Sequence, residues 1–223
     1  MKVGTDGILL GAWAGGSRPD RILDIGSGTG LIALMLAQRF NEAEVDAVEI
    51  DASASAQCVE NFFHSPWSHR LTLFPGDINA VCREQLADRK YSLIVSNPPW
   101  FRDCLKSDDL PRNTARHTDA LGTEDLLHAA GDLLSPDGRL VVILPYDQGI
   151  CFMATALQYG LHRSRQCDVY PDVAKSAKRM LLEFSREPAG ASPGTERLVI
   201  ENSQRHDYTA EFRALTKAFY LRF

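Results

Sequence analysis

The segment Asn97-Pro98-Pro99-Trp100 follows a strand-like run at residues 91–96 and combines the side chains best suited to chemistry. Two consecutive prolines cannot continue a hydrogen-bonded ladder, so the strand must end there. The Asn97 amide oxygen and the Pro98 carbonyl can accept both N–H bonds of a planar –NH2 group, on which Trp100 can stack. Taken alone, the segment is explained equally well as a turn whose tryptophan fills the core, because turns commonly contain Asn and Pro.

A glycine-rich segment follows an earlier strand-like run at residues 21–25. Its residues are Asp24-Ile25-Gly26-Ser27-Gly28-Thr29-Gly30. Glycines allow backbone amides to approach a ligand closely. A nicotinamide-dinucleotide site would have the spacing GxGxxG, whereas Leu31 follows the third glycine here. With an acid two residues before the first glycine, the pattern resembles the cofactor loop of class I S-adenosylmethionine-dependent methyltransferases.

Two acidic residues stand at or just past the ends of other strand-like runs. Glu49 ends the second run, where a carboxylate meets ribose hydroxyls in this class of sheet, although surface acids are also common at strand ends. Asp77, followed by Ile78, can accept a hydrogen bond from an adenine amine. It can equally be the N-cap of the following helix, and one carboxylate can serve in both roles.

Strand-like and helix-like segments alternate along the chain. The predicted strands cover residues 21–25, 44–49, 71–74, 91–96, 139–144, 179–184 and 197–200. Between them, helices are predicted at residues 31–37, 52–64, 77–87 and 123–134, the last with Thr123 as N-cap and followed by a turn at residues 135–138. This alternation predicts one α/β domain with a doubly wound, seven-stranded, mostly parallel, Rossmann-like sheet.

Ligands of such sheets bind beyond the carboxyl ends of the strands, so the glycine loop, Glu49, Asp77 and Asn97 are expected at one crevice. Residues 208–223 carry an apolar helical face that we expect to dock on the body of the domain.

Composition excludes several classes of protein. The 223 residues carry a net charge of −5, so nucleic-acid binding would require a local basic patch. Five scattered cysteines without a CxxC pair fit reduced thiols better than a zinc site or disulfides. No run reaches the roughly 18 apolar residues of a membrane span, and a strand beginning at about Ile22 leaves no room for a cleaved leader. We expect a cytoplasmic, metal-free protein.

The long connection after Trp100 is rich in basic residues. They are Arg102, Lys106, Arg112, Arg116 and His117. Phosphate contact is one interpretation, since long connections in compact domains are often functional. A merely solvated loop is equally well supported, because Asp103, Asp108 and Asp109 dilute the positive charge. Lys175, Lys178 and Arg179 form a second basic cluster.

A family resemblance covers essentially the whole chain. Residues 97–100 match the [DNS]-P-P-[YFW] motif of amino-methyltransferases, which act on –NH2 groups. The opening Lys2-Val3-Gly4-Thr5-Asp6-Gly7-Ile8-Leu9-Leu10-Gly11-Ala12-Trp13 and the ending Leu215-Thr216-Lys217-Ala218-Phe219-Tyr220 resemble the bacterial tRNA1(Val) adenosine-37 N6-methyltransferase family. The family pattern has a further short N-terminal segment before Lys2, so we expect residues 1–223 to lack that segment, and Trp100 stands where Tyr is usual.

The resemblance implies a monomer that uses S-adenosylmethionine to methylate adenine N6 in the anticodon loop of a tRNA. The implied catalytic residues are Asn97, Pro98 and Trp100. The implied cofactor-binding residues are Lys2, Gly4, Thr5, Asp6, Asp24, Gly26, Gly28, Gly30, Glu49, Asp77, Ile78 and Asn97. The implied RNA contacts are the five basic residues after Trp100.

Other acceptors remain open, because ribosomal RNA bases, DNA adenine and protein glutamine also present a planar –NH2 group. A non-catalytic RNA-binding scaffold is a further alternative, which the intact glycines, Glu49, Asp77 and Asn97 disfavour.

Overall fold

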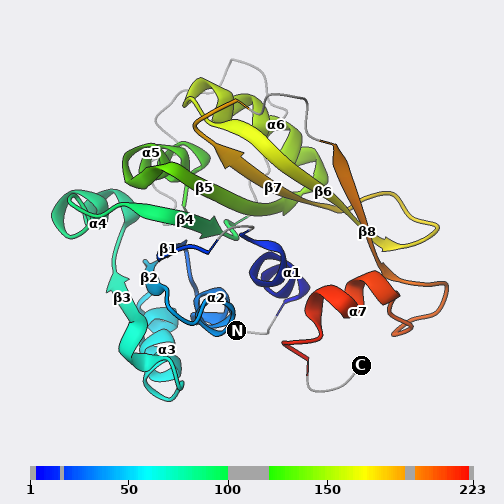
Figure 1. Cartoon of the computed structure of the whole chain (residues 1–223), viewed down its shortest axis with the longest axis horizontal. Coiled ribbons are helices and arrows are strands. Elements are labelled where there is room, and N and C mark those ends of the chain that lie inside the picture. The colour runs from blue at the N-terminus through cyan, green and yellow to red at the C-terminus, as the bar shows by residue number, and fades with distance from the viewer. Residues whose placement is uncertain (1–3, 16–17, 100–120, 189–193, 221–223) are drawn as a thin grey trace.

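A single sheet runs through the part of the chain that the computed structural model describes, residues 4–15, 18–99, 121–188 and 194–220 (Figure 1). Within these residues its eight strands lie in the order β3-β2-β1-β4-β5-β7-β6-β8. The strands are β1 (Arg21–Ile25), β2 (Glu44–Glu49), β3 (Leu71–Pro75), β4 (Tyr91–Ser96), β5 (Leu134–Pro145), β6 (His162–Asp172), β7 (Arg179–Ser185) and β8 (Thr195–Glu201). The α/β class is therefore confirmed.

The first five strands are parallel, and only β7 runs against its neighbours. β1 pairs with β2 on one side and with β4 on the other, and β7 lies antiparallel between β5 and β6. β8 pairs in parallel with β6. The carboxyl ends of β1, β2, β4 and β5 therefore share one edge of the sheet, which is where ligands bind in open α/β sheets.

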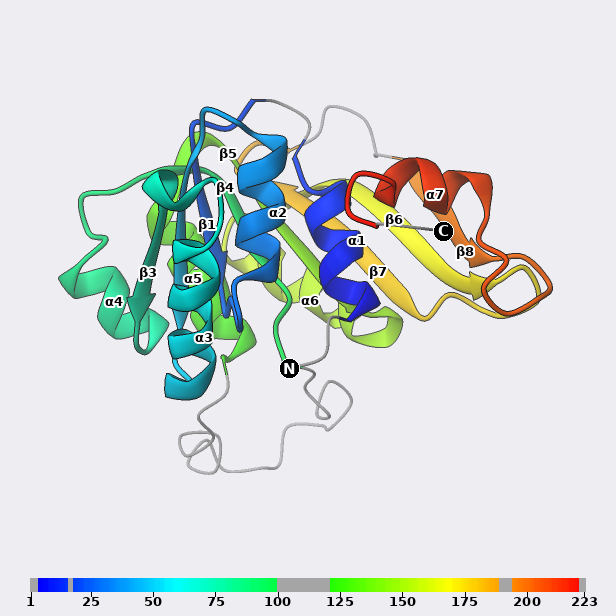
Figure 2. The same ribbon diagram turned by 90° about the horizontal axis from the view of Figure 1, so that it is seen from below.

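Helices cover both faces of the sheet (Figures 1 and 2). The first core joins the sheet to α1 (Thr5–Trp13), α2 (Leu31–Arg39), α3 (Ala52–Phe63) and α7 (Ala210–Thr216). The second core joins it to α4 (Ile78–Glu84), α5 (Thr123–Leu133) and α6 (Tyr146–Gln158). A short 3-10 helix, Ser68–Arg70, precedes β3.

The central strands are apolar on both faces because both faces are covered. In β1, Ile22 belongs to the first core and Leu23 to the second, and successive residues of β5 alternate in the same way. The predicted docking of the C-terminal helical face is confirmed, since Phe212 of α7 is fully buried in the first core.

One strand, β6, and two helices, α1 and α6, were not expected from the sequence. The sequence of β6 is polar and therefore does not look like a buried strand. In the structure Gln166 and Asp168 are nevertheless buried, and Nε2 of Gln166 donates a hydrogen bond to Oδ1 of Asp168 at 2.8 Å. α1 was missed because it is buried on most sides and shows no amphipathic pattern. α6 was also not expected.

Two local predictions around β5 were wrong. Gly122, not Thr123, is the N-cap of α5, and no side chain caps that helix end. Residues 135–138 lie within β5, where the register with β4 shifts between Tyr91 and Leu93. These four residues therefore form an irregularity in a strand rather than a separate turn before it.

Among the described residues, none of the helices has the length and apolar character needed to cross a membrane. The same residues contain no cluster of three or more His, Cys, Asp or Glu that could hold a metal ion.

Candidate active site

The glycine loop connects β1 to α2 at the carboxyl edge of the sheet. Gly26, Gly28 and Gly30 all have positive φ angles, of 72°, 57° and 82°. Glycine adopts this backbone region without the steric cost that a side chain would bring. The amides of Gly26 and Ser27 both donate to the Val48 carbonyl, at 2.9 and 3.1 Å, so the loop is fixed to the end of β2.

Glu49 holds the same loop through its side chain. Its Oε2 accepts from the Gly28 amide at 2.6 Å, and its Oε1 accepts from the Asp51 amide at 2.8 Å. The residue is buried, with 8% of its surface exposed. Each carboxylate oxygen has two lone pairs, so the group retains capacity to accept from a ligand hydroxyl.

Two buried polar atoms beside the loop have no hydrogen-bond partner among the described residues. They are Oδ1 of Asp24 and Oγ of Ser27, whereas Oδ2 of Asp24 accepts from the Ala33 amide at 3.1 Å. Burial, and next the negative charge of Glu49, raise the pKa of Asp24 to about 7. Buried polar groups in proteins are normally satisfied, so these atoms mark a place for a polar ligand.

Space in front of the loop is open at Gly26 and closed at Gly30. A methyl group added to Gly26 would approach only Cδ2 of Leu121, at 3.6 Å. The same addition at Gly30 would come within 2.6 Å of Phe62 and 2.7 Å of the Cys58 sulfur. Gly30 is therefore required for packing against α3, while Gly26 leaves room for a bound molecule.

Asn97 follows the end of β4, directly beside this loop. The preceding residue, Ser96, is fully buried and donates from Oγ to the Ile25 carbonyl at 2.8 Å. This bond ties the end of β4 to the end of β1, so Asn97 extends past the sheet edge where the glycine loop begins. Pro98 is buried and Pro99 is exposed. Trp100 and the five basic residues after it lie outside the described residues.

Asp77 is the N-cap of α4, as one of the two interpretations expected. Its Oδ1 accepts from the amides of Asn79 and Ala80, at 3.0 and 3.2 Å, while the residue remains exposed. Ile78 is buried in the second core. The Gly76 amide donates to the Glu49 carbonyl at 2.8 Å, which holds the start of α4 at the end of β2.

Ile50 is a candidate site residue that the sequence analysis did not single out. It follows Glu49 directly and is 46% exposed. The available signal was a hydrophobic residue continuing past the predicted end of the strand. Its position offers an apolar surface between Glu49 and the start of α3.

The start of the chain contacts the body of the domain, and the cofactor-binding role that the resemblance implied for it stays a prediction. Gly4 and Thr5 are exposed at the start of α1, and Lys2 lies outside the described residues. The Asp6 carboxylate accepts from Nε of Arg179 at 2.8 Å, which joins α1 to the start of β7.

Gly7 and Gly11 of α1 lie where this helix packs against α2. A methyl group at Gly7 would lie 3.4 Å from Leu31, and at Gly11 it would lie 2.8 Å from the Met35 sulfur. The two glycines therefore allow α1 to approach α2 closely.

Comparisons with known proteins agree with this geometry. Residues 9–158 match the family model described as methyltransferase small domain. A tRNA1(Val) (adenine(37)-N6)-methyltransferase of Parabacteroides distasonis is 46% identical over 222 residues, covering 100% of this chain and 92% of the relative. The protein of the same name from Salmonella arizonae is 45% identical, covering 99% and 89%.

Solved structures show the same fold at low sequence identity. A predicted O-methyltransferase from Agrobacterium tumefaciens superposes with a TM-score of 0.70 at 20% identity, covering 96% of each chain. The glycopeptide N-methyltransferase MtfA in complex with S-adenosyl-L-methionine gives a TM-score of 0.56 at 14% identity, covering 82% of this chain and 95% of MtfA.

Proposed function

Because the chain belongs to the family of the tRNA1(Val) (adenine(37)-N6)-methyltransferases, we propose that it methylates N6 of adenosine 37 in tRNA1(Val) with S-adenosylmethionine. The proposal takes the protein as a cytoplasmic monomer with one domain. The observation that carries it is the meeting of three features at one sheet edge: the glycine loop, the Glu49 carboxylate bound to that loop, and Asn97 at the end of β4.

The residues present fit the cofactor. Glu49 has acceptor capacity for ribose hydroxyls, the exposed Ile50 offers an apolar surface for the adenine ring, and Asp77 can accept from the adenine amine. The orphaned Asp24 and Ser27 oxygens, and the open space over Gly26, suit the polar amino-acid portion. When bound, S-adenosylmethionine supplies a methyl group that is activated for attack because it is bonded to a positively charged sulfur.

Asn97 and Pro98 would act on the acceptor amine. The lone pair of an adenine amine is delocalised into the ring, which makes the nitrogen a poor nucleophile. Acceptance of its two N–H bonds by the Asn97 side-chain oxygen and the Pro98 carbonyl favours a pyramidal nitrogen, whose lone pair is free to attack. No strong base is needed before attack, and the proton leaves the nitrogen afterwards to solvent.

Trp100 would stack on the adenine once the base has left the anticodon-loop stack. Such stacking is worth about 1–3 kcal/mol per base. Arg102, Lys106, Arg112, Arg116 and His117 would contact phosphates. Neutralising Arg112 and Arg116 together should then weaken tRNA binding and flatten its dependence on salt.

The experiment that tests the proposal compares acceptor classes directly. Purified protein is incubated with radiolabelled S-adenosylmethionine and, separately, with total tRNA, ribosomal RNA, DNA and protein from a strain that lacks the enzyme. Incorporation into tRNA alone supports the proposal. Incorporation only into ribosomal RNA, DNA or protein would show that tRNA is not the acceptor. If calorimetry detects no binding of the cofactor, a non-catalytic scaffold is favoured.

A further inference from the structure

A cavity lies on the far side of α1 from the glycine loop, in the half of the sheet formed by β7, β6 and β8. Its volume is about 260 Å³. The lining residues used below are Asp6, Lys178, Arg179, Glu201, Tyr208 and Tyr220. They come from the start of α1, the start of β7, the end of β8 and the segment around α7, which lie together in Figures 1 and 2.

This cavity opens at the same sheet edge as Asn97. Arg179, the first residue of β7, pairs with Pro145 at the carboxyl end of β5, and Val169 of β6 pairs with Arg179 in turn. The Tyr146 amide also donates to the Lys178 carbonyl at 3.2 Å. Since β6 lies three strand positions from β4, the cavity is roughly 14 Å from the end of β4 along the edge. A nucleic-acid strand bound at Asn97 can reach it.

Aromatic rings form one wall of the cavity. Tyr208 stacks on the buried Phe212 with ring centroids 5.1 Å apart and an interplanar angle of 26°, and Tyr220 lies at 6.1 Å from Phe212. Tyr208 and Tyr220 are both partly exposed. A planar ring that enters the cavity therefore meets aromatic side chains with which it can stack.

The charges around the cavity are balanced. Asp6 and Arg179 pair with each other at 2.8 Å, while Glu201 accepts from the His206 amide at 2.9 Å. Lys178 is exposed. Because the lining contains as many carboxylates as cations, it does not suit several phosphates. These charged side chains provide hydrogen-bond acceptors for the N–H edge of a base and leave one exposed ammonium group for a single phosphate.

We propose that this cavity binds one nucleobase of the substrate RNA, from a nucleotide that flanks the methylated adenosine, with Lys178 at its phosphate. The inference rests on the proposed function, because it assigns part of the same substrate to a second site. Stacking on Tyr208 and Tyr220 holds the base, and the cavity volume admits a single ring system. The second contact sets the register of the strand, so that the intended adenine reaches Asn97.

The test measures kcat/KM for methylation of tRNA1(Val) transcripts that keep adenosine 37 and carry a single abasic residue at one of the three positions before it or the three positions after it. The enzymes are the wild type and Tyr208→Leu, which keeps an apolar side chain but removes the ring. One abasic position should lower wild-type kcat/KM about 10-fold. Tyr208→Leu should lower it about as much on intact RNA and show no further loss at that position.

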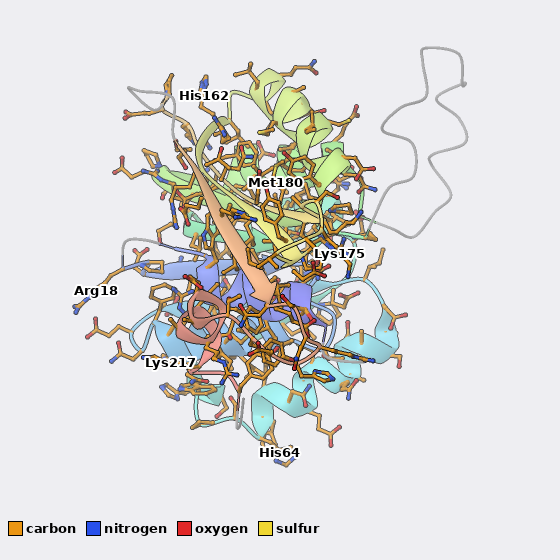
Figure 3. All side chains as sticks on the ribbon, turned by 90° about the vertical axis from the view of Figure 1, so that its right-hand side faces the viewer. Arg18, His64, His162, Lys175, Met180 and Lys217 are labelled. Carbon is orange, nitrogen blue, oxygen red and sulfur yellow. The ribbon has the colours of Figure 1, made fainter. Side chains whose placement is uncertain are left out.

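Lys178→Gln extends the test with a substitution of an exposed side chain. It should weaken RNA binding and reduce the salt dependence, whereas Lys217→Gln should change neither. Lys217 is a matched control because it is exposed at the end of α7, and Figure 3 shows it well apart from Lys175 in the β6–β7 connection. Cofactor affinity, measured for every variant, reports whether the fold is intact.

The outcomes separate the two proposals. Wild-type enzyme that is inactive on the intact transcript would overturn the proposed function and this inference with it. The wild-type enzyme is active in the other case. If the effects of Tyr208→Leu and of every abasic substitution on kcat/KM then simply multiply, the proposal that the cavity binds a base is overturned, while the proposed function stands. If Tyr208→Leu does not fold, the lysine variants decide. Equal RNA affinity and equal salt dependence of Lys178→Gln and Lys217→Gln would overturn the proposal that the cavity binds a base.

Discussion

The Gly28 amide donates to the Glu49 carboxylate at 2.6 Å, which joins the loop after β1 to the end of β2. Parallel strands place these two residues at the same edge, but this bond also fixes the loop in the conformation that its positive φ angles allow. Glu49 therefore has two functions in this account: it positions the loop, and it remains available to the cofactor.

Glu49→Gln should weaken S-adenosylmethionine binding by about 10-fold or more, because hydrogen bonds to charged groups contribute about 1.5–3 kcal/mol. Calorimetry measures the dissociation constant. The matched control is Glu44→Gln at the opposite end of β2, where the side chain is exposed and pairs with Arg21. Exposed pairs of this kind contribute little. Equal affinities of the two variants would show that Glu49 has no role at the cofactor.

Asp24→Asn should change how stability depends on pH. The pKa of Asp24 in the folded protein is raised to about 7 by burial, from an ordinary value of 3.8. Between these two values the folded state holds a proton that the unfolded state has lost, so the free energy of unfolding falls as pH rises. Above pH 7 this loss is complete.

Urea unfolding of the cofactor-free protein at pH 5 and pH 8 measures the effect. Between these pH values the free energy of unfolding of the wild type should fall by roughly 2–3 kcal/mol more than that of Asp24→Asn. The difference between the two proteins isolates Asp24, because the other titrating groups are common to both. Identical pH dependence would mean that Asp24 is not held in its neutral form.

Gly11→Ala should destabilise the protein by about 1–3 kcal/mol despite the higher helix propensity of alanine. The new methyl group would lie 2.8 Å from the Met35 sulfur and 3.1 Å from the Met35 Cβ in the contact between α1 and α2, and Met35 is buried, so the two helices must move apart. Gly131→Ala in α5 is the matched control, since nothing lies within 4 Å of its added methyl group. That variant should be stabilised by about 0.5–1 kcal/mol. Thermal unfolding ranks the two, and the reverse order would contradict close packing at Gly11.

Asn97→Ala should abolish methyl transfer while leaving S-adenosylmethionine affinity nearly unchanged. The amide oxygen is assigned to the acceptor amine, and the loop that receives the cofactor is held by Ser96, Val48 and Glu49 instead. Single-turnover rates and calorimetric dissociation constants measure the two properties. Cofactor affinity that falls together with the rate would indicate that Asn97 maintains the loop.

Local patterns predicted the parts of the fold that are locally determined. The central strands read as short apolar runs because both faces are buried, and the glycine loop was recognisable from its spacing. The order of these strands then placed Glu49 and Asn97 at one edge. Their roles toward the cofactor and the acceptor amine stay predictions, as does the role of Asp77.

Other parts depend on contacts between distant residues and carry no local signal. Asp6 and Arg179 are 173 positions apart, so nothing near Asp6 indicates its partner. The polar residues of β6 resemble an exposed segment until Gln166 and Asp168 are seen to pair in the interior. Gly7 and Gly11 disfavour a helix in isolation, yet α1 forms because they allow it to pack on α2.

The most direct test of the central claim is the position of the new methyl group in tRNA1(Val). An unmodified transcript is incubated with the protein and S-adenosylmethionine, digested with a base-specific ribonuclease and mapped by mass spectrometry. The account predicts N6-methyladenosine at position 37 and no methylation of a transcript with guanosine there. A methyl group at another nucleotide, or adenosine 37 left unmodified by protein that binds the cofactor, would contradict it.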